Sequence, residues 1–528
     1  MSTAGTAVAS GHERPNNASA NRTTLPEWIG LVSILIVGMV IRISDWPQFP
    51  DWGDPVNYSI GALYTHVAHP PGYVGYCLLL GWVNDLVHDI KTTLILVNVC
   101  AAIVATFLCH RVAHAVGLRG AAALAAASLY WFSVNTLHAS LYGGPHVFEG
   151  LMSLLFGLLA IRAIQRKSIS CALAASIVIA AAGSFRPTTT ILLLPLWLYV
   201  IWRSDLHPLY RRLGQVAVHG AIVASIVAAW SWANNHYMTA QGYGGTTYQD
   251  QVVSSTTYDY DNLSGNAVGV RGAPRATFHM PVAELLAWIE VKTGLRLIPH
   301  VPGWPTPSLG RVIRLSGMQL VKQTWWLVFS LPIIVVLPVF ALLRPSWLAR
   351  PPRETERILS LWILPAVTFF IVGHMGILTY LQIYLGPMSV ATTYFLLGNP
   401  RKQETPGDVP ADSNNASPHA PPRSLLGAVI LGSLALSVGF YVFSRPFNAP
   451  SGTRRLLDIA ALQFDGYSRR MAFTTSRNEG NTDVPESSAP SVFSEYRAAR
   501  TDRELLDVAR RNQFLYARFP PSSPSTGP

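Results

Sequence analysis

The sequence predicts an all-α protein that crosses a membrane many times. Of its 528 residues, 50% are hydrophobic and only 13% are charged, whereas a soluble globular domain carries about 25% charged residues. Apolar runs recur along the chain, several of them close to the roughly 20 residues that a helix needs to span a bilayer. The 15 Trp and 20 Tyr residues suit the aromatic belts that form at membrane surfaces.

About eleven apolar segments are predicted to cross the bilayer. They are 28–44, 92–110, 120–137, 147–165, 168–184, 189–203, 214–233, 324–343, 358–376, 379–398 and 425–443. Segment 72–88 is also apolar, but glycines, Asn84 and Asp85 interrupt it. If 72–88 lies in the outer surface without crossing, the Arg and Lys clusters between the spans fall in the cytoplasm, as the positive-inside rule requires. We therefore expect that arrangement, with a cytoplasmic N-terminus.

This topology divides the chain into five regions. They are a disordered cytoplasmic tail (1–27), a membrane module (28–233) with a large first outer loop (45–91), a second outer loop that contacts substrates (234–323), the last spans with a cytoplasmic linker at 399–424 (324–443), and a small α-helical tail domain (444–528). Within the tail, 453–464 and 492–515 are predicted amphipathic helices. We expect the tail on the outer face, but charge constrains long domains weakly, so the cytoplasmic side remains the alternative.

Charge and cysteine content exclude several classes of function. The net charge of +11 comes largely from Arg clusters in short loops, which set topology, and it gives no reason to expect a nucleic-acid partner. All four cysteines lie in apolar segments without a Cys-x-x-Cys pair. They are predicted to be buried hydrophobic residues and not part of a zinc site or a disulfide framework.

The acidic stretch that follows the first span is the first candidate for chemistry. Asp54 lies near the outer end of that span, where water or a cation can keep it ionised and able to accept a proton from a nucleophile. Asp51 is close in sequence and is predicted to assist it or to hold a divalent cation such as Mg²⁺ or Mn²⁺. The alternative is an acidic loop that is merely solvated.

A predicted amphipathic helix over 55–66 follows these carboxylates, with Pro55 in its first turn. His69 comes next, and the two prolines after it exclude a helix. Gly72 and Tyr73 then lead into segment 72–88. This rigid turn is expected to bring His69 and Tyr73 over the ends of the spans as substrate-binding residues. The alternative is an interfacial helix without a catalytic role.

The first loop resembles that of the GT-C membrane glycosyltransferases, in the branch related to protein O-mannosyltransferases that carries a His-Pro-Pro-Gly-Tyr motif. The matching residues are Asp51, Gly53, Asp54, Val67, Ala68, His69, Pro70, Pro71, Gly72 and Tyr73. Asp54 stands where the family usually has Glu, which keeps the carboxylate but shortens its reach. Two weaker similarities lie at 184–187 and at 373–380, the second with its glycines displaced.

The resemblance implies a GT-C-like bundle that transfers a sugar, such as the hexose mannose, from a polyprenyl-phosphate donor. The acceptor would be a protein, a glycan or a lipid, and the reaction would invert the anomeric carbon. The site would lie on the non-cytoplasmic face. We expect a multi-pass protein of a bacterial plasma membrane, with its site on the periplasmic or extracellular side.

Four further residues are candidates near the outer ends of spans. Arg186 offers a planar fork of donors to phosphate oxygens, with His374 as its predicted companion; the alternatives are an Arg that reaches lipid headgroups and a His that only packs. Glu149 and His146 are predicted substrate-binding residues. The alternative for Glu149 is an acid that stabilises a helix N-terminus.

Two other functions remain possible from the sequence. A flippase or transporter for a lipid-linked substrate would place charges and broken helices near the bilayer midplane, often in two related halves. Here the charges and helix breaks gather at the outer rim, and no second copy of the first half is visible. The other alternative is a catalytically inactive membrane assembly protein, which the shorter acid and the displaced glycines leave open.

Overall fold

A computed structural model describes most of the hydrophobic part of the chain. The described residues are 24–45, 54–68, 73–204, 209–240, 281–294, 308–373, 378–398, 423–443 and 499–511. Within them every regular element is a helix. The prediction of an all-α membrane protein is confirmed in this general form.

Six described helices are long and apolar enough to cross a membrane. They are α1 (Leu25–Asp45), α4 (Ile90–Ala115), α7 (His146–Arg166), α10 (Leu209–Ala240), α16 (Arg353–Thr368) with the adjoining η6 (Phe369–Gly373), and α18 (Arg423–Phe443). A seventh is possible if α14 (Leu309–Ser330) and the η4 (Pro332–Val335) and α15 (Val336–Leu343) helices act as one span, although they are bent by 118°. The larger number expected from the sequence stays a prediction.

The predicted span 120–137 consists of two helices, α5 (Ala121–Trp131) and α6 (Val134–Tyr142). The chain breaks at Ser133, whose side chain accepts a hydrogen bond from the backbone N–H of Thr136 and so begins α6. Arg42 of α1 stabilises the end of α5 by donating from Nη2 to the Trp131 carbonyl, 3.2 Å away. Its guanidinium also lies 3.5 Å from the centre of the Trp131 ring.

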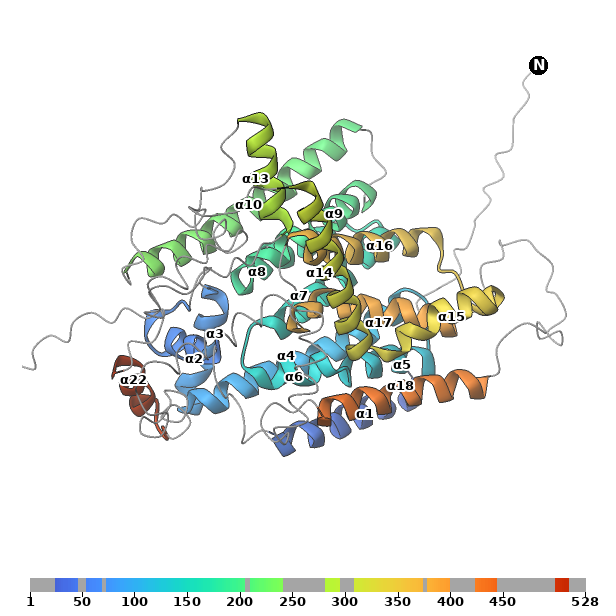
Figure 1. The fold of residues 1–528 in the computed structure, drawn as a ribbon, viewed down its shortest axis with the longest axis horizontal. Helices are drawn as coiled ribbons and strands as arrows, with labels where there is room; N and C mark the ends of the chain where they lie inside the picture. The colour runs from blue at the N-terminus through green and yellow to red at the C-terminus, as the bar shows by residue number, and fades with distance from the viewer. Residues whose placement is uncertain are drawn as a thin grey trace, which may run out of the picture.

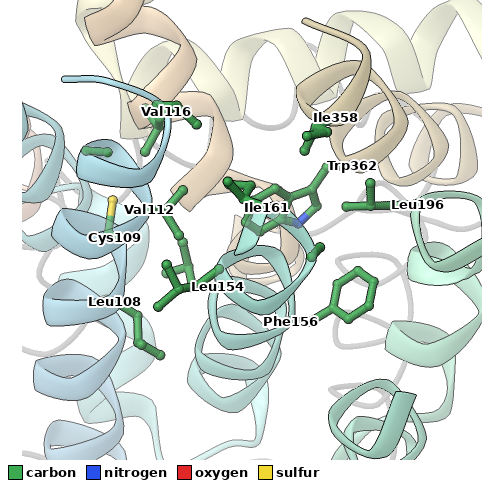
Figure 2. Close-up of a cluster of buried hydrophobic side chains, with 14 of the residues drawn as sticks. Leu108, Cys109, Val112, Val116, Leu154, Phe156, Ile161, Leu196, Ile358 and Trp362 are labelled. Carbon is green, nitrogen blue, oxygen red and sulfur yellow. The ribbon is translucent and has the colours of Figure 1, made fainter. Parts of the chain in front are cut away.

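The centre of the bundle is formed by α4, α5, α7 and α17 (Gln382–Leu397), which pack against one another. Figure 2 shows Trp362 of α16 pointing onto α7 in this core. A Cβ at Gly157 of α7 would lie only 1.8 Å from the Trp362 ring, so the close approach depends on glycine. Small residues at such contacts are typical of helix packing in membranes.

Several short helices gather at one end of the molecule, opposite α15 (Figure 1). They are α2 (Asp54–Ile60), the π-helix η3 (Gly61–Thr65), α3 (Val74–Val87) and α22 (Asp502–Arg511). The helix expected over 55–66 is therefore observed as α2 and η3. The 14 residues of α3 make about 21 Å of helix, less than the roughly 30 Å of a bilayer core. The expectation that segment 72–88 does not cross stays a prediction.

The remaining helices complete the fold. They are α8 (Ile169–Phe185), α9 (Pro187–Ser204), α13 (Pro281–Thr293), η5 (Pro345–Trp347) and η7 (Leu378–Leu381). The α8 and α9 helices pack against α7, and α3 packs against α8. A Cβ at Gly75 of α3 would collide with the side chain of Ser184. The α3 helix, the last helix of the first loop, is thereby held against the end of α8.

Candidate functional site

Arg186 occupies the single position between α8 and α9, and the sequence explains why. Pro187 begins α9, and a residue before proline is pushed out of the helical conformation. Arg186 accordingly has φ −159° and ψ 115°, while its backbone N–H still bonds to the Ala182 carbonyl of α8. This kink directs the side chain of Arg186 towards the start of α7.

Arg186, Glu149 and His146 form a compact buried cluster. The Nη1 atom of Arg186 donates a hydrogen bond of 2.6 Å to Glu149 Oε1 and lies 2.8 Å from His146 Nδ1. His146 Nδ1 also lies 2.9 Å from Glu149 Oε1. Depending on its tautomer, this nitrogen accepts from Arg186 or donates to Glu149. All three residues are at most 4% exposed, so the three predicted site residues are brought together.

The electrostatics of this cluster keep the guanidinium charged. Burial by itself lowers the pKa of Arg186, because the charged form loses its hydration. The negative charge of Glu149, its hydrogen bond and the neighbouring tyrosines together outweigh that effect and raise the pKa of Arg186 above its ordinary value. The hydroxyls of Tyr380 and Tyr73 act in the same direction. A fixed cation is therefore present at this site at any physiological pH.

Tyr380 of η7 covers the guanidinium from another side. Its ring centre lies 3.8 Å from Arg186 Cζ and 5.2 Å from the His146 ring. An Arg over an aromatic face is stabilised by the ring quadrupole, and more so when water is excluded. Tyr380 was not predicted as a site residue, although it ends the weak motif at 373–380. Nothing in the sequence around Tyr380 indicates that its ring contacts Arg186.

Half-buried and buried polar side chains continue from this cluster into the bundle. On α6, the His138 and Tyr142 rings lie 5.5 Å apart, and Tyr142 lies 6.5 Å from the ring of His146. Deeper in, Gln382 Nε2 donates to Asn135 Oδ1 at 2.7 Å. The sequence did not predict these residues, because polar positions inside apolar helices look like ordinary interruptions of a span.

Tyr130 and Gly150 complete this inner network. The hydroxyl of Tyr130 donates to Gln382 Oε1 at 2.9 Å. Gly150 follows Glu149 directly, and a Cβ there would lie 2.6 Å from the Tyr130 oxygen and 2.8 Å from Gln382 Oε1. The polar network thus comes within one residue of the Arg186 cluster because glycine leaves room for it.

Two nitrogens of Arg186 and one oxygen of Glu149 are left without a hydrogen bond in the ion pair. Both bonds of Arg186 to neighbouring side chains run through Nη1, and both partners of Glu149 meet Oε1. Among the described residues, Nε and Nη2 of Arg186 and Oε2 of Glu149 make no hydrogen bond. The cluster can therefore offer two guanidinium nitrogens, which carry three N–H groups, and one carboxylate oxygen to a ligand.

Tyr73, just before α3, is the residue of the first loop that acts electrostatically on Arg186. Tyr73 precedes α3 with φ 54°, a left-handed conformation that is unusual for a bulky residue and that marks local strain. Its ring meets the Tyr58 ring edge to face at 5.5 Å. Tyr58 lies one turn after Asp54, which begins α2.

The other predicted residues fall outside what the structure describes. Asp51, His69 and His374 lie outside the described residues, and so does the side chain of Asp54. Their assignments stay predictions. The described residues contain no group of three or more His, Cys, Asp or Glu side chains placed to bind a metal. Glu149 is already paired with a cation, so the described cluster does not fit a divalent metal ion.

Comparison of the chain with protein-family models, curated proteins and solved structures finds no match. The likeness of the first loop to the GT-C glycosyltransferases therefore rests on its motif residues alone. The site itself consists of a buried guanidinium with free donors, a carboxylate beside it, and aromatic rings that include Tyr73 and Tyr380.

Proposed function

We propose that this protein is a membrane glycosyltransferase. It would transfer a sugar, such as a hexose, from a polyprenyl-phosphate donor to a protein, glycan or lipid acceptor on the non-cytoplasmic side of the membrane. The observation that carries the proposal is the Arg186 guanidinium, which is buried, fixed by Glu149 and Tyr380, and left with two unused donor nitrogens.

The guanidinium suits the phosphate of a lipid-linked donor. An Arg fork donates two parallel hydrogen bonds to phosphate oxygens, and its planar shape is held here before any ligand arrives. Donors that are preorganised where charge develops lower the barrier most, because no reorganisation is needed during the reaction. Arg186 would stabilise the phosphate as the bond between the anomeric carbon and its oxygen breaks.

Glu149, His146 and Tyr380 would position this cation. Glu149 holds one nitrogen of the fork at 2.6 Å and offsets the cost of burying its charge. Tyr380 covers one face of the fork and so limits its rotation. The remaining edge, formed by Nε and Nη2, is then the part of Arg186 that contacts the donor.

The acceptor would be activated from the first loop. In the proposed step, an acceptor oxygen forms the new bond to the anomeric carbon while the phosphate leaves with the bonding electrons. The acceptor proton passes to Asp54, which acts as the general base. The link from α2 through Tyr58 and Tyr73 to the surroundings of Arg186 supports this division of roles.

A reconstitution experiment tests the proposal. The full chain is placed in vesicles with radiolabelled polyprenyl-phosphate hexose and cell-envelope acceptors, and transfer of label out of the lipid is measured. Asp54→Asn and Arg186→Lys are each expected to reduce transfer by about 100-fold or more, the usual effect of losing a general base or a fixed charge donor. Arg203→Lys is the matched control, because Arg203 lies in the last turn of α9 and is exposed.

Each outcome decides between the candidate functions. Label that leaves the lipid only with the wild type and the control supports the transferase. Label that crosses the bilayer still attached to its lipid indicates a flippase and overturns the proposal. If no label moves under any condition while the protein remains folded, an inactive assembly protein becomes the better account.

A further inference from the structure

The C-terminal helix α22 is attached to the junction between α3 and α4. The carboxylate of Asp502 accepts hydrogen bonds from Asn84 Nδ2 at 2.8 Å and from the backbone N–H of Ile90 at 3.0 Å. Lys91 Nζ donates to the Ala499 carbonyl at 2.9 Å. These contacts join parts of the chain that are more than 400 residues apart.

The position of Asp502 has a clear electrostatic reason. Ile90 is the first residue of α4, and the first N–H groups of a helix have no partner within the helix. Asp89 satisfies one of them, the N–H of Lys91. Asp502 supplies a second carboxylate from elsewhere in the chain, and its negative charge is favourable beside the positive end of the helix dipole. Asn84 is held for this contact by Thr93, whose hydroxyl donates to Asn84 Oδ1 at 3.1 Å.

An apolar contact reinforces the polar ones. Leu505 is only 1% exposed and belongs to the same cluster of buried residues as Tyr58, Tyr76 and Phe148. On the same helix, Arg503 and Glu504 are exposed. Tyr76 meets both Tyr58 and Phe148 edge to face, and Phe148 is the residue before Glu149. The α22 helix therefore packs on the aromatic cluster that supports the first loop.

We propose that residues 499–507 form a strap that clamps the α3–α4 junction and lies on the same side of the membrane as the first loop and Arg186. The 26 residues of α4 make about 39 Å of helix, longer than the roughly 30 Å bilayer core, so the two ends of α4 emerge on opposite sides. The strap binds the end that carries Ile90. Figure 1 shows α22 beside α2 and α3 at that end. This inference does not depend on the proposed transferase activity.

The strap can be tested by the accessibility of one buried position. Leu505→Cys is introduced into the full chain in which Cys100 and Cys171, the cysteines that are not fully buried, are replaced by Ala. A membrane-impermeant maleimide is expected to label this cysteine slowly. Adding Asn84→Asp places two carboxylates together, which should release the strap and speed labelling about tenfold or more, as for the loss of a hydrogen bond to a charged group.

Exchanging the two partners should restore the clamp. In Asn84→Asp with Asp502→Asn, the amide and the carboxylate change places, so Thr93 and Ile90 keep acceptors and labelling should return to the slow rate. Arg503→Gln, on the exposed side of α22, is the control and should label as slowly as the parent. Fast labelling in the parent, or an equal rate in Asn84→Asp, overturns the strap, because both mean that Leu505 is not protected by this contact.

The same reagent decides the side of the membrane. In the released variant, Leu505→Cys should be labelled from the same side as Tyr64→Cys, a partly exposed position in the first loop, and from the side opposite to Arg203→Cys at the far end of α9. If Leu505→Cys is labelled from the same side of the membrane as Arg203→Cys, the inference is overturned, even if the protein is an active transferase. Conversely, if the labelling of Leu505→Cys is as expected but the protein transfers no sugar, the inference holds and only the proposed function fails.

Discussion

The Nη1 atom of Arg186 lies 2.6 Å from Oε1 of Glu149, and both side chains are almost completely buried. Breaking such a pair from one side costs more than the pair itself contributes, because the remaining charge is left buried and unpaired. Glu149 belongs to α7 and Arg186 lies between α8 and α9, so the pair joins α7 to the α8–α9 junction at the site.

Loss of Glu149 should destabilise the fold strongly. Glu149→Gln leaves Arg186 charged and without its counterion, for which we expect a loss of about 3–5 kcal/mol in the free energy of unfolding. Glu354→Gln is the matched control, since Glu354 pairs with Arg203 at a largely solvated site and should cost at most about 1 kcal/mol. Unfolding in detergent, followed by circular dichroism, measures both. Similar losses in the two variants would contradict the account.

The aromatic face of Tyr380 should matter more than its hydroxyl. Tyr380→Leu removes the ring over Arg186 and is expected to cost about 2 kcal/mol, the value for a desolvated cation–π contact. Tyr380→Phe keeps the ring and should cost less. Thermal unfolding of the purified variants gives the comparison. If Tyr380→Phe and Tyr380→Leu lower the stability equally, the ring contact is not what stabilises the guanidinium of Arg186.

Gly150 should not tolerate a methyl group. Gly150→Ala would push a Cβ against Tyr130 and Gln382, and overpacking of this kind costs about 1–3 kcal/mol. Gly214 in α10 has no atom within 4 Å of the corresponding position, so Gly214→Ala should be neutral or stabilising by up to about 1 kcal/mol. Equal stability of the two variants, measured by chemical denaturation, would mean that the inner network is not packed as described.

Arg42 should not be replaceable by Lys. Its guanidinium bonds to Ser140 Oγ, the Gly38 carbonyl and the Trp131 carbonyl, and a Lys ammonium cannot reproduce that planar arrangement. Leaving these buried acceptors without donors should cost about 1–3 kcal/mol. Arg314→Lys, at an exposed position of α14, serves as the comparison and should be within about 0.5 kcal/mol of the parent. If Arg42→Lys is as stable as the parent, the end of α5 does not depend on the hydrogen bond from Arg42 to the Trp131 carbonyl.

The parts of the fold that were predictable have local causes. The helix after Asp54 followed from its apolar spacing and Pro55, and the break between α8 and α9 followed from the gap between the apolar runs 168–184 and 189–203. The general membrane character followed from composition. The break at Ser133 was missed because an averaged apolar run conceals one capping residue within it.

The parts that were not predictable depend on distant partners. Tyr380 meets Arg186, Gln382 meets Asn135, and Asp502 meets Asn84. Each pair brings together residues far apart in the chain, and nothing in the spacing of either member points to the other. Glu149 was predicted as a possible substrate ligand, but its role as the counterion of Arg186 could be seen only once α7 and α8 were in position.

The most direct test of the central claim is the binding of polyprenyl phosphate to the purified protein. At a ligand concentration of about 100 times Kd, binding should stabilise the wild type by about 2.7 kcal/mol and raise its thermal midpoint, whereas polyprenol without the phosphate should have little effect. Arg186→Lys should lose most of this difference, and Arg203→Lys should keep it. If phosphate and alcohol stabilise the wild type equally, or if Arg186→Lys responds like the wild type, Arg186 does not bind the donor phosphate.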